Sequence, residues 1–344
     1  MENLPLGLTY DDVLLRPGKS LESRSLADTS TTLPYPNKVG YITLKVPILS
    51  ANMADITEQG MAAAMYNAGG LGIIHRFCRI DHALAMWLIC KQTYTPVFMS
   101  IGVNDKERIT LLADTGCKAF CIDVANGYSD AVARTIEYLR TTIPGVVVMA
   151  GNVATREGAL FLMSAGADII KAGIGPGSCC TTRLVTGCGM PQLSAIAECA
   201  EVAHYLIADG GIRGSGDIVK ALTMGADAVM IGKLLAGTPE APGKPIYNTL
   251  TASSSKIYSG SASKKQQDKC DMNGKNRTTE GVTAQVQCAE STIKVVTDLL
   301  KGIRSGMSYV GAQNLAELRM ASFIRVTQSG YTEGLPHALL NNTM

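Results

Sequence analysis

The sequence predicts an α/β fold, and within that class a (β/α)8 barrel, from three observations. Eight short apolar runs rich in valine and isoleucine begin roughly 22 to 37 residues apart, enough for a strand, a helix and two short loops. Helix-like stretches separate the runs, and glycines and polar residues collect directly after them. An open doubly wound sheet is the alternative, but it seldom needs eight evenly spaced units, and no G-x-G-x-x-G follows the first run.

Each predicted strand reads as a continuous apolar segment, as expected for a parallel sheet that is buried on both faces. The predicted strands are residues 46–49, 70–74, 97–101, 119–123, 146–150, 168–171, 205–208 and 228–231. The clearest predicted helices are residues 58–66, 129–139, 156–164, 216–224 and, as a closing helix, 293–303.

We expect one catalytic domain over residues 1–344. Its predicted segments are an N-terminal arm (1–45), the barrel (46–236), a flap on the C-terminal face (about 237–281), and a C-terminal helix and tail (282–344). The flap sequence is mostly polar with little periodicity, which is typical of a mobile lid; a disordered surface insertion is the alternative. Within the tail, residues 323–330 are predicted to be a strand or extended chain.

Composition excludes several classes of protein. Apolar residues make up 46% of the chain and charged residues 17%, so it is not disordered. The net charge is +2 and there is no basic block or aromatic platform, so nucleic acid is not an expected partner. No zinc-type C-x-x-C pair occurs among the ten cysteines, and Cys90, Cys117, Cys121 and Cys199 lie in apolar segments, which indicates a reducing environment. Without a signal-peptide pattern or an apolar run of about 18 residues, we expect a cytoplasmic protein that does not bind membranes.

Polar side chains follow the predicted strands at the C-terminal end of the barrel, where (β/α)8-barrel enzymes have their active sites. They are Asn52, Asp55, His75, Arg76, Asp123, Asn126, Asn152, Asp209 and Lys233. Because few polar groups are kept beside an apolar core without a ligand to meet them, these residues predict a binding pocket.

The segment 171–183, which follows the sixth predicted strand, combines glycines with two thiols. Gly175 and Gly177 have no Cβ, so the main chain there can adopt positive φ and approach a ligand or ion closely. A thiolate such as that of Cys180 is the strongest nucleophile a side chain offers near neutral pH. The alternative is a glycine turn with two core cysteines, since cysteine is often buried. The hydroxyl groups and the cationic neighbour Arg183 favour a functional loop.

Glycines after the seventh and eighth strands predict a phosphate site. Barrels commonly hold phosphate between these two loops, and the backbone N–H groups of Gly210, Gly211 and Gly232 can point there, joined by the hydroxyl of Ser178. Asp209 can accept hydrogen bonds from ribose hydroxyls. Plain tight turns are the alternative for these glycines.

Four specific motifs stand out in the sequence, at residues 8–17, 171–183, 208–213 and 231–238. Together they resemble the IMP dehydrogenase/GMP reductase family, and the resemblance covers nearly the whole chain. Stretches that resemble the reductase branch are Asn52 and residues 123–129, 149–153, 175–178, 191–195 and 323–328. Stretches that resemble the dehydrogenase branch are Lys233 and residues 69–75, 212–217 and 236–243.

The flap sequence favours the reductase branch. Residues 258–280 are short and contain no Arg-Tyr pair, with which dehydrogenases activate water. Ala54, Arg76 and the pair Ser259-Gly260 depart from the usual family residues at their positions, and there is no room for a regulatory CBS pair between the second and third strands.

The resemblance implies an NADPH-dependent GMP reductase, which makes IMP and ammonia through a covalent cysteine intermediate. IMP dehydrogenase, which uses NAD, is the first alternative, and a catalytically silent purine-nucleotide sensor is the second. The resemblance implies Cys180 as the nucleophile, with Thr182 and Glu280 as a proton relay. It also implies K⁺ bound by the backbone of Gly175, Gly177 and Cys180 near Arg183, and a homotetramer or octamer.

The resemblance further implies two sets of binding residues. Those for the nucleotide are Ser178, Asp209, Gly210, Gly211, Gly232, Lys233, Gly260, Ser261, Arg277, Thr279 and Gly281. Those for NADPH are Ser23, Arg24, Arg76, Asp123, Val124, Ala125, Tyr309, Gly311 and Ala312, with the segment 309–312 contributed by a neighbouring subunit.

Overall fold

A closed barrel of eight parallel strands forms the centre of the molecule, as the sequence predicts. The computed structural model describes residues 4–249, 251–269 and 278–336. In chain order the barrel strands are β4 (Ile48–Ser50), β5 (Leu71–Ile74), β6 (Val97–Ile101), β7 (Ala119–Asp123), β8 (Val147–Val153), β9 (Ile169–Ala172), β10 (Leu206–Asp209) and β11 (Ala228–Ile231). Each strand pairs with the next, and β11 pairs with β4 to close the barrel.

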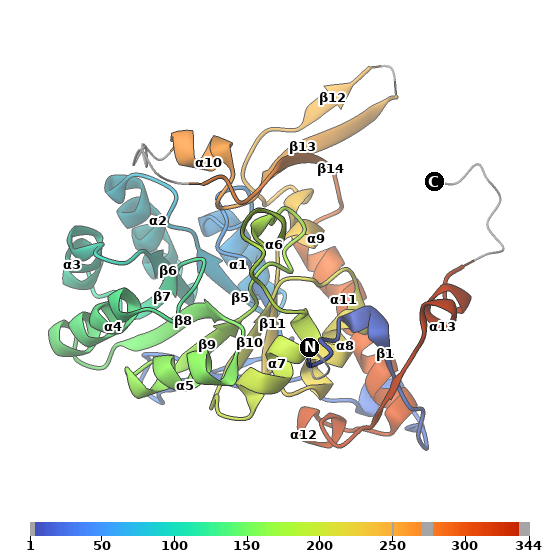
Figure 1. Cartoon of the computed structure of the whole chain (residues 1–344). Helices are drawn as coiled ribbons and strands as arrows, with labels where there is room; N and C mark the ends of the chain where they lie inside the picture. The colour runs from blue at the N-terminus through green and yellow to red at the C-terminus, as the bar shows by residue number, and fades with distance from the viewer. Residues whose placement is uncertain (1–3, 250, 270–277, 337–344) are drawn as a thin grey trace.

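Helices surround the barrel and connect successive strands (Figure 1). They are α1 (Gln59–Asn67), α2 (Ile80–Gln92), α3 (Lys106–Asp114), α4 (Asp130–Thr142), α5 (Arg156–Ser164), α7 (Gln192–Ala200) and α8 (Ser215–Thr223). After β11 the chain forms only the short α9 (Lys233–Ala236), and the ring is completed by α11 (Thr292–Val310), which packs against α1 and α8.

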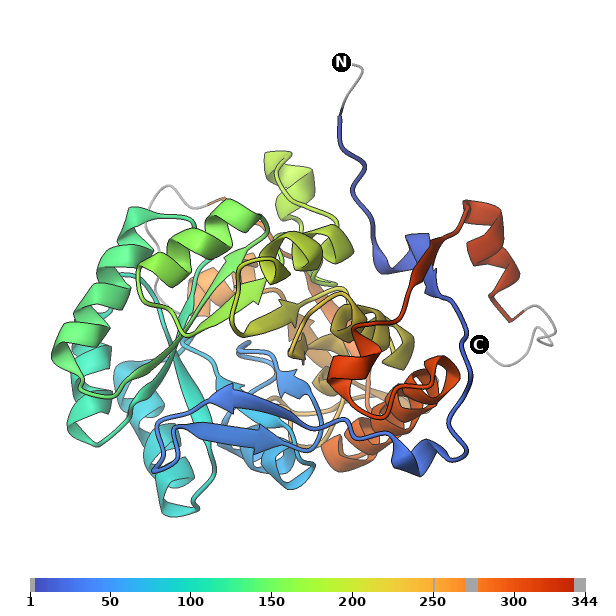
Figure 2. The ribbon, with the colours of Figure 1, turned by 90° about the horizontal axis from the view of Figure 1, so that it is seen from below.

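The interior of the barrel is filled by side chains from alternate positions along the strands. Leu49, Phe98, Met149 and Met230 are fully buried there, because successive residues of a strand point to opposite faces. A hairpin of β2 (Thr31–Pro34) and β3 (Tyr41–Leu44) lies across the N-terminal end (Figure 2). Its inward side chains Leu33, Ile42 and Leu44 join the same apolar cluster, so this end of the barrel is closed.

The same alternation places polar groups in the uppermost layer of the barrel. On β9 the residue two positions after the buried Ile169 is Lys171, and on β10 the residue two positions after Ile207 is Asp209. Because β9 and β10 are neighbours, these two side chains meet at the C-terminal mouth.

The two ends of the chain pair with each other outside the barrel. In the arm, the 3-10 turns η1 (Tyr10–Asp12) and η2 (Arg24–Leu26) flank β1 (Val13–Leu15), which is antiparallel to β15 (Phe323–Arg325). The tail also contains α12 (Leu315–Leu318) and α13 (Gln328–Glu333). The prediction of extended chain over residues 323–330 is therefore right only as far as Arg325, since Thr327 caps the following helix through its side chain.

The flap is more ordered than the sequence predicts. It contains β12 (Ile246–Asn248), β13 (Ser253–Ser259) and α10 (Lys264–Lys269), and β14 (Thr283–Gln287) completes a three-stranded antiparallel sheet. The hairpin of β12 and β13 projects beyond the body (Figure 1). The sequence of β13 does not show the usual alternation of apolar and polar residues, because Lys256 occupies an inward position. The buried ammonium of Lys256 donates to the carbonyls of Thr238 (2.8 Å) and Ala241 (2.7 Å).

A short helix, α6 (Thr182–Thr186), follows the loop after β9, as the short α9 follows β11. No helix in the three described ranges combines the length and the apolar character needed to cross a bilayer.

A pair of glycine variants tests how closely the helices approach the barrel. A Cβ on Gly72 of β5 would lie 2.6 Å from the Cα of Ala62 in α1, so we expect Gly72→Ala to lower the free energy of unfolding by about 1–3 kcal/mol. Nothing lies within 4 Å of the equivalent atom on Gly216 in α8, and alanine is the better helix former there. Gly216→Ala is therefore the control, and urea unfolding should show it equal to or more stable than the parent.

Candidate functional site

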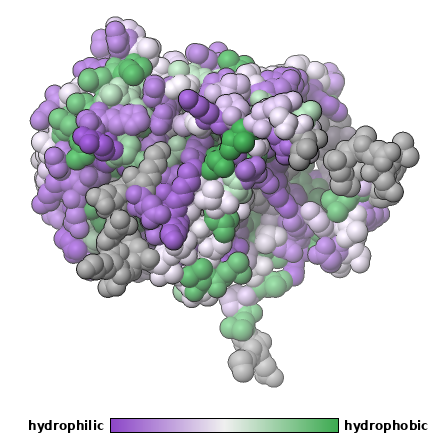
Figure 3. Space-filling model, turned by 90° about the horizontal axis from the view of Figure 1, so that it is seen from above, coloured by the Kyte–Doolittle hydropathy of each residue, from purple (hydrophilic) through white to green (hydrophobic). Residues whose placement is uncertain are grey.

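A cavity of about 610 Å³ opens at the C-terminal mouth of the barrel. Its walls come from the loops after β4, β5, β7, β8, β9 and β10 and from the flap. On the face of the molecule at this end of the barrel, hydrophilic side chains are mixed with separate small apolar patches (Figure 3). A cavity of this size suits a nucleotide-sized ligand.

Three predicted catalytic residues form a continuous hydrogen-bonded row in this cavity. The thiol of Cys180 donates to Thr182 Oγ1 over 3.1 Å, and the Thr182 hydroxyl donates to Glu280 Oε2 over 2.9 Å. Cys180 and Thr182 come from the loop after β9, whereas Glu280 comes from the flap, 98 positions along the chain from Thr182. All three line the cavity. The row therefore connects a nucleophile to a carboxylate that can accept its proton.

Main-chain hydrogen bonds hold the β9 loop and the flap together. Thr181 N donates to Glu280 O and Val282 N donates to Cys179 O, both over 2.9 Å. Gly281 bridges to Cys180 on one side and to Ser263 on the other. A Cβ on Gly260 would lie 2.9 Å from the Cys179 carbonyl oxygen, so the flap backbone passes directly over the loop. These contacts fix Glu280 opposite Thr182.

Cys180 has a different environment from the cysteines in the core. Burial raises the pKa of the Cys117, Cys121 and Cys199 thiols to about 12 and that of Cys90 to about 11, so these thiols stay protonated. None of the nine cysteines in the described ranges forms a disulfide. Cys180 is only half-buried and faces the cavity, which is where a reactive thiol is needed.

The side chain of Arg183 closes the loop that carries Cys180. Its Nε donates to the carbonyl of Ile174 over 3.3 Å, and its Nη2 donates to the carbonyl of Met190. The side chain passes between Gly175 and Gly189, where a Cβ on either would lie 2.5 Å from Arg183 Cγ. Both ends of the loop are therefore tied to one guanidinium.

The predicted K⁺ site on this loop stays a prediction. Gly175 has φ +87°, and the carbonyl of Gly177 already accepts a hydrogen bond from Cys180 N at 2.9 Å. In the part of the chain that the structure describes, His, Cys, Asp and Glu side chains form no group of three that could bind a metal ion.

Four segments meet where the sequence predicts a phosphate site. Ser178 Oγ donates to the hydroxyl of Tyr258 over 3.3 Å, and a Cβ on Gly232 would lie 3.0 Å from the same hydroxyl. A Cβ on Gly210 would lie 3.2 Å from Gly177 N, so the loops after β9 and β10 touch. Gly210 and Gly211 have φ +96° and +79°, a conformation that favours glycine.

Tyr258 is a site residue that the sequence reasoning missed. Burial raises its pKa to about 12, so its hydroxyl stays protonated. It donates to the weak acceptor Met53 Sδ over 3.7 Å, a bond that a stronger, anionic acceptor can replace. Tyr258 lies on β13 two residues after Lys256, so the two side chains share the inward face of the strand. Recognising residues 253–259 as a strand would have predicted this position for Tyr258.

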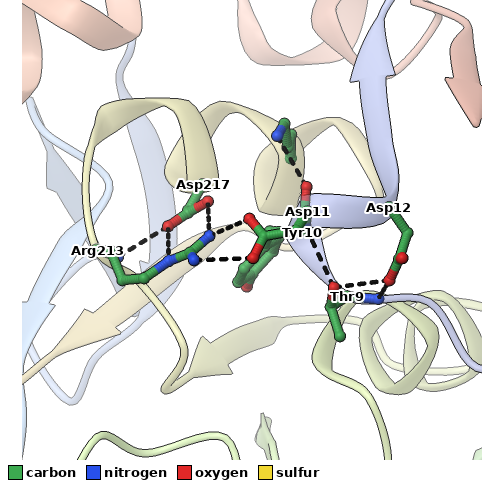
Figure 4. A network of polar contacts seen from close by, with 7 residues as sticks. Thr9, Tyr10, Asp11, Asp12, Arg213 and Asp217 are labelled. Atoms are coloured by element: carbon green, nitrogen blue, oxygen red, sulfur yellow. Dashed lines mark hydrogen bonds and ion pairs between the residues drawn. The ribbon is translucent and has the colours of Figure 1, made fainter. Parts of the chain in front are cut away.

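Polar contacts connect the N-terminal arm to Arg213 and Asp217, next to the predicted phosphate turn (Figure 4). The ring edge of Tyr10 lies 3.3 Å from where a Cβ on Gly211 would stand. Arg213, two residues further on, donates to Asp11 at 2.9 Å and to Asp217 at 3.2 Å, and Lys220 donates to the carbonyl of Tyr10 at 2.8 Å. The arm therefore holds the Gly210–Gly211 turn in place.

The predicted NADPH residues fall into two separate groups. Arg76, Asp123, Val124 and Ala125 line the cavity, where Arg76 Nε donates to the Asp123 carbonyl over 3.1 Å and lies 3.5 Å from its carboxylate. The second group comprises Ser23, Arg24, Tyr309, Gly311 and Ala312. The first three are exposed and Gly311 is half-buried, whereas Ala312 is buried. Gly18 N donates to Tyr309 O over 2.9 Å, so the arm and the end of α11 adjoin each other, but none of the five lines the cavity of the same chain.

The remaining predicted nucleotide residues have mixed positions. Gly260 and Ser261 line the cavity, while Lys233 and Thr279 are exposed and do not line it. Arg277 lies outside the described residues.

A substitution at Arg183 tests whether its guanidinium holds the nucleophile loop closed. We expect Arg183→Met to lower the free energy of unfolding by about 1–3 kcal/mol, because the Ile174 and Met190 carbonyls lose a charged donor. Arg156→Met is the matched control, since its ion pair with Glu201 is exposed and should contribute less than about 1 kcal/mol. Equal stability of the two variants in urea would contradict the assignment.

Comparison with known proteins identifies the family. Residues 7–337 match the IMP dehydrogenase / GMP reductase domain. The chain is 37% identical to GMP reductase 1 of Mus musculus over 342 residues, which cover 95% of this chain and 97% of that protein. It is 45% identical to the inosine-5'-monophosphate dehydrogenase of Aquifex aeolicus over 253 residues, which cover 69% of this chain but only 50% of that relative. The inosine-5'-monophosphate dehydrogenase of Cryptosporidium parvum is 34% identical over 392 residues, with 98% of this chain and 96% of that protein covered. The chain belongs to the IMP dehydrogenase/GMP reductase family of oxidoreductases.

Proposed function

We propose that this protein reduces GMP to IMP and ammonia with NADPH. The observation that carries the proposal is the row of Cys180, Thr182 and Glu280 at the cavity wall, in a chain that aligns over 95% of its length with a GMP reductase. A thiol beside a hydroxyl–carboxylate pair supplies a nucleophile together with a route for its proton. The proposed substitution at C2 of the purine uses both the nucleophile and the route for its proton.

The chemistry divides into two steps. In the first, the sulfur of Cys180 bonds to C2 of the purine, and the 2-amino group leaves as ammonia with the thiol proton, which Thr182 and Glu280 relay. NADPH, when bound, supplies a hydride for C2. In the second step the C–S bond breaks as C2 accepts that hydride, IMP leaves, and a solvent proton restores the Cys180 thiol. GMP, NADPH and one proton thus give IMP, ammonia and NADP⁺.

The nucleotide is proposed to lie across the mouth of the barrel. Asp209 is positioned to accept hydrogen bonds from the ribose, and Ser178, Gly210, Gly232 and Tyr258 surround the place for the phosphate. Contacts from Gly211, Lys233, Gly260, Ser261, Arg277, Thr279 and Gly281 follow from the family resemblance.

The cavity wall opposite the nucleotide fits a nicotinamide group. Arg76 and Asp123 form a fixed polar pair there, with Val124 and Ala125 beside them. Ser23, Arg24 and the segment 309–312 lie away from this cavity, so we propose that they bind the adenosine end of a cofactor held by another copy, in a homotetramer or octamer. K⁺ on the loop of Gly175, Gly177 and Cys180, and a cytoplasmic location, belong to the same proposal.

Two other functions compete with the reductase. The dehydrogenase of Aquifex aeolicus is 45% identical to this chain, which favours oxidation of IMP with NAD. Against this, residues 258–280 contain no Arg-Tyr pair to activate water for hydrolysis of the covalent intermediate. A catalytically silent sensor would have no need of the Cys180 row.

Parallel assays separate the three functions. Protein with GMP and NADPH is expected to lose absorbance at the NADPH band and to yield IMP. We expect Cys180→Ala to reduce this turnover by at least about a thousandfold, because no other residue is proposed for the covalent step. Cys188→Ser is the matched control, since Cys188 is exposed on the same loop and outside the cavity, and it should keep its activity.

The outcomes are distinct. NADH formation from IMP and NAD would select the dehydrogenase, and nucleotide binding without either turnover would select the sensor. Retained activity in Cys180→Ala would reject the covalent mechanism.

Tyr258→Phe tests the proposed phosphate site. Hydrogen bonds to a charged group contribute about 1.5–3 kcal/mol, so we expect KM for GMP to rise about 10- to 100-fold while kcat changes little. Guanosine lacks the phosphate, and its binding measured by calorimetry should not change. Equal losses for GMP and guanosine would place Tyr258 elsewhere in the mechanism.

A further inference from the structure

A buried ammonium group lies at the floor of the cavity. Lys171 is only 1% exposed, and its Nζ donates to Asn52 Oδ1 over 3.2 Å and to Asp209 Oδ2 over 3.1 Å. Asp123 Oδ1 lies 3.6 Å away on a third side. Asn152 Nδ2 donates to the same Asp209 oxygen over 2.9 Å. Lys171 of β9 therefore connects the ends of β4, β7 and β10, and β8 joins them through Asp209.

The charge of Lys171 is held in place by its neighbours. Burial acts to lower the pKa of this ammonium, but the attraction of Asp209, with a smaller contribution from Asp123, outweighs it and raises the pKa above the ordinary value. Lys171 therefore remains a cation that has only donors to offer.

This cation fixes the orientation of the Asn52 side chain. Because an ammonium cannot accept a hydrogen bond, the oxygen of the Asn52 amide must face Lys171, and the NH₂ group must point the other way. Asn52 is 4% exposed and lines the cavity, and its Nδ2 atom is buried with no hydrogen-bond partner among the described residues. A buried donor without an acceptor costs about 1–3 kcal/mol, so such an atom at a cavity wall indicates an acceptor that arrives with the ligand.

We propose that Asn52 is a ligand-binding residue whose amide NH₂ donates to an uncharged acceptor oxygen of the bound ligand, and that Lys171 is the positioning residue that orients it. The ligand follows from the proposed function. The carboxylates of Asp209 and Asp123 beside Lys171 disfavour an anionic oxygen, and the proposed phosphate cradle lies at Ser178 and Tyr258. Two sources of the acceptor remain, a ribose oxygen of the nucleotide and the carboxamide oxygen of the nicotinamide.

Binding measurements with the two products distinguish these sources. IMP and NADP⁺ are titrated separately by calorimetry into the full chain and into Asn52→Leu and Asn52→Asp. Both variants lose the donor, and Asn52→Asp also keeps the oxygen that faces Lys171, so it is informative if the leucine variant fails to fold. We expect the dissociation constant of one ligand to rise about tenfold in both variants. A loss for IMP identifies the ribose oxygen, and a loss for NADP⁺ identifies the carboxamide.

Controls separate binding from stability. Asn67→Leu makes the same change at an exposed position at the end of α1 and should leave both dissociation constants unchanged. Lys171→Met should weaken both ligands, because Asp209 and Asp123 lose their common partner together with Asn52. A fall in thermal stability of the Asn52 variants with both dissociation constants unchanged would overturn the proposal.

The result does not depend on turnover. A protein that binds IMP and NADP⁺ but does not reduce GMP would refute the proposed reaction and still allow the Asn52 comparison. A reductase with Cys180-dependent activity whose Asn52 variants bind both ligands normally would refute only the role of Asn52.

Discussion

The pleat of the closed barrel is the constraint on which the site depends. Every second residue of each strand must point inward, and at the lower layers those positions hold Leu49, Phe98, Met149 and Met230. At the top layer the same rule turns Lys171 and Asp209 inward, and the two side chains meet because β9 and β10 are neighbouring strands. A lysine, an aspartate and an asparagine amide could not share an apolar interior individually, but together they satisfy most of one another's hydrogen bonds.

The row of Cys180, Thr182 and Glu280 has a different origin from the floor of the cavity. The floor comes from strand ends, whereas Cys180 lies on the loop after β9, Thr182 is the first residue of α6, and Glu280 lies on the flap. Their alignment is set by main-chain hydrogen bonds between loop and flap and by the Arg183 guanidinium within the loop. A floor of strand ends with a row supported by two loops combines a fixed place for the ligand with freedom for ligands to enter and leave.

The sequence was sufficient for the parts of the fold that repeat. All eight barrel strands could be predicted because parallel strands buried on both faces are continuous apolar runs, and the residues of the Cys180 row could be named from motifs. The flap sheet could not, because Lys256 stands at an inward position of β13 and hides the alternation. Tyr258 was missed for the same reason. Lys171 was overlooked as a polar group because it continues the apolar run of β9, and only the structure shows the three side chains that surround it.

The pairing of β1 with β15 has a consequence for how the chain reaches its native state during synthesis. Val13 faces Arg325 across this ladder, and the segment that contains Val13 also braces the turn at Gly210 and Gly211. A ribosome releases residue 325 long after the barrel strands have emerged, so the barrel can assemble while one side of the predicted phosphate turn still lacks full support. The residues of β15 therefore complete the support of a turn whose own residues are translated more than a hundred codons earlier.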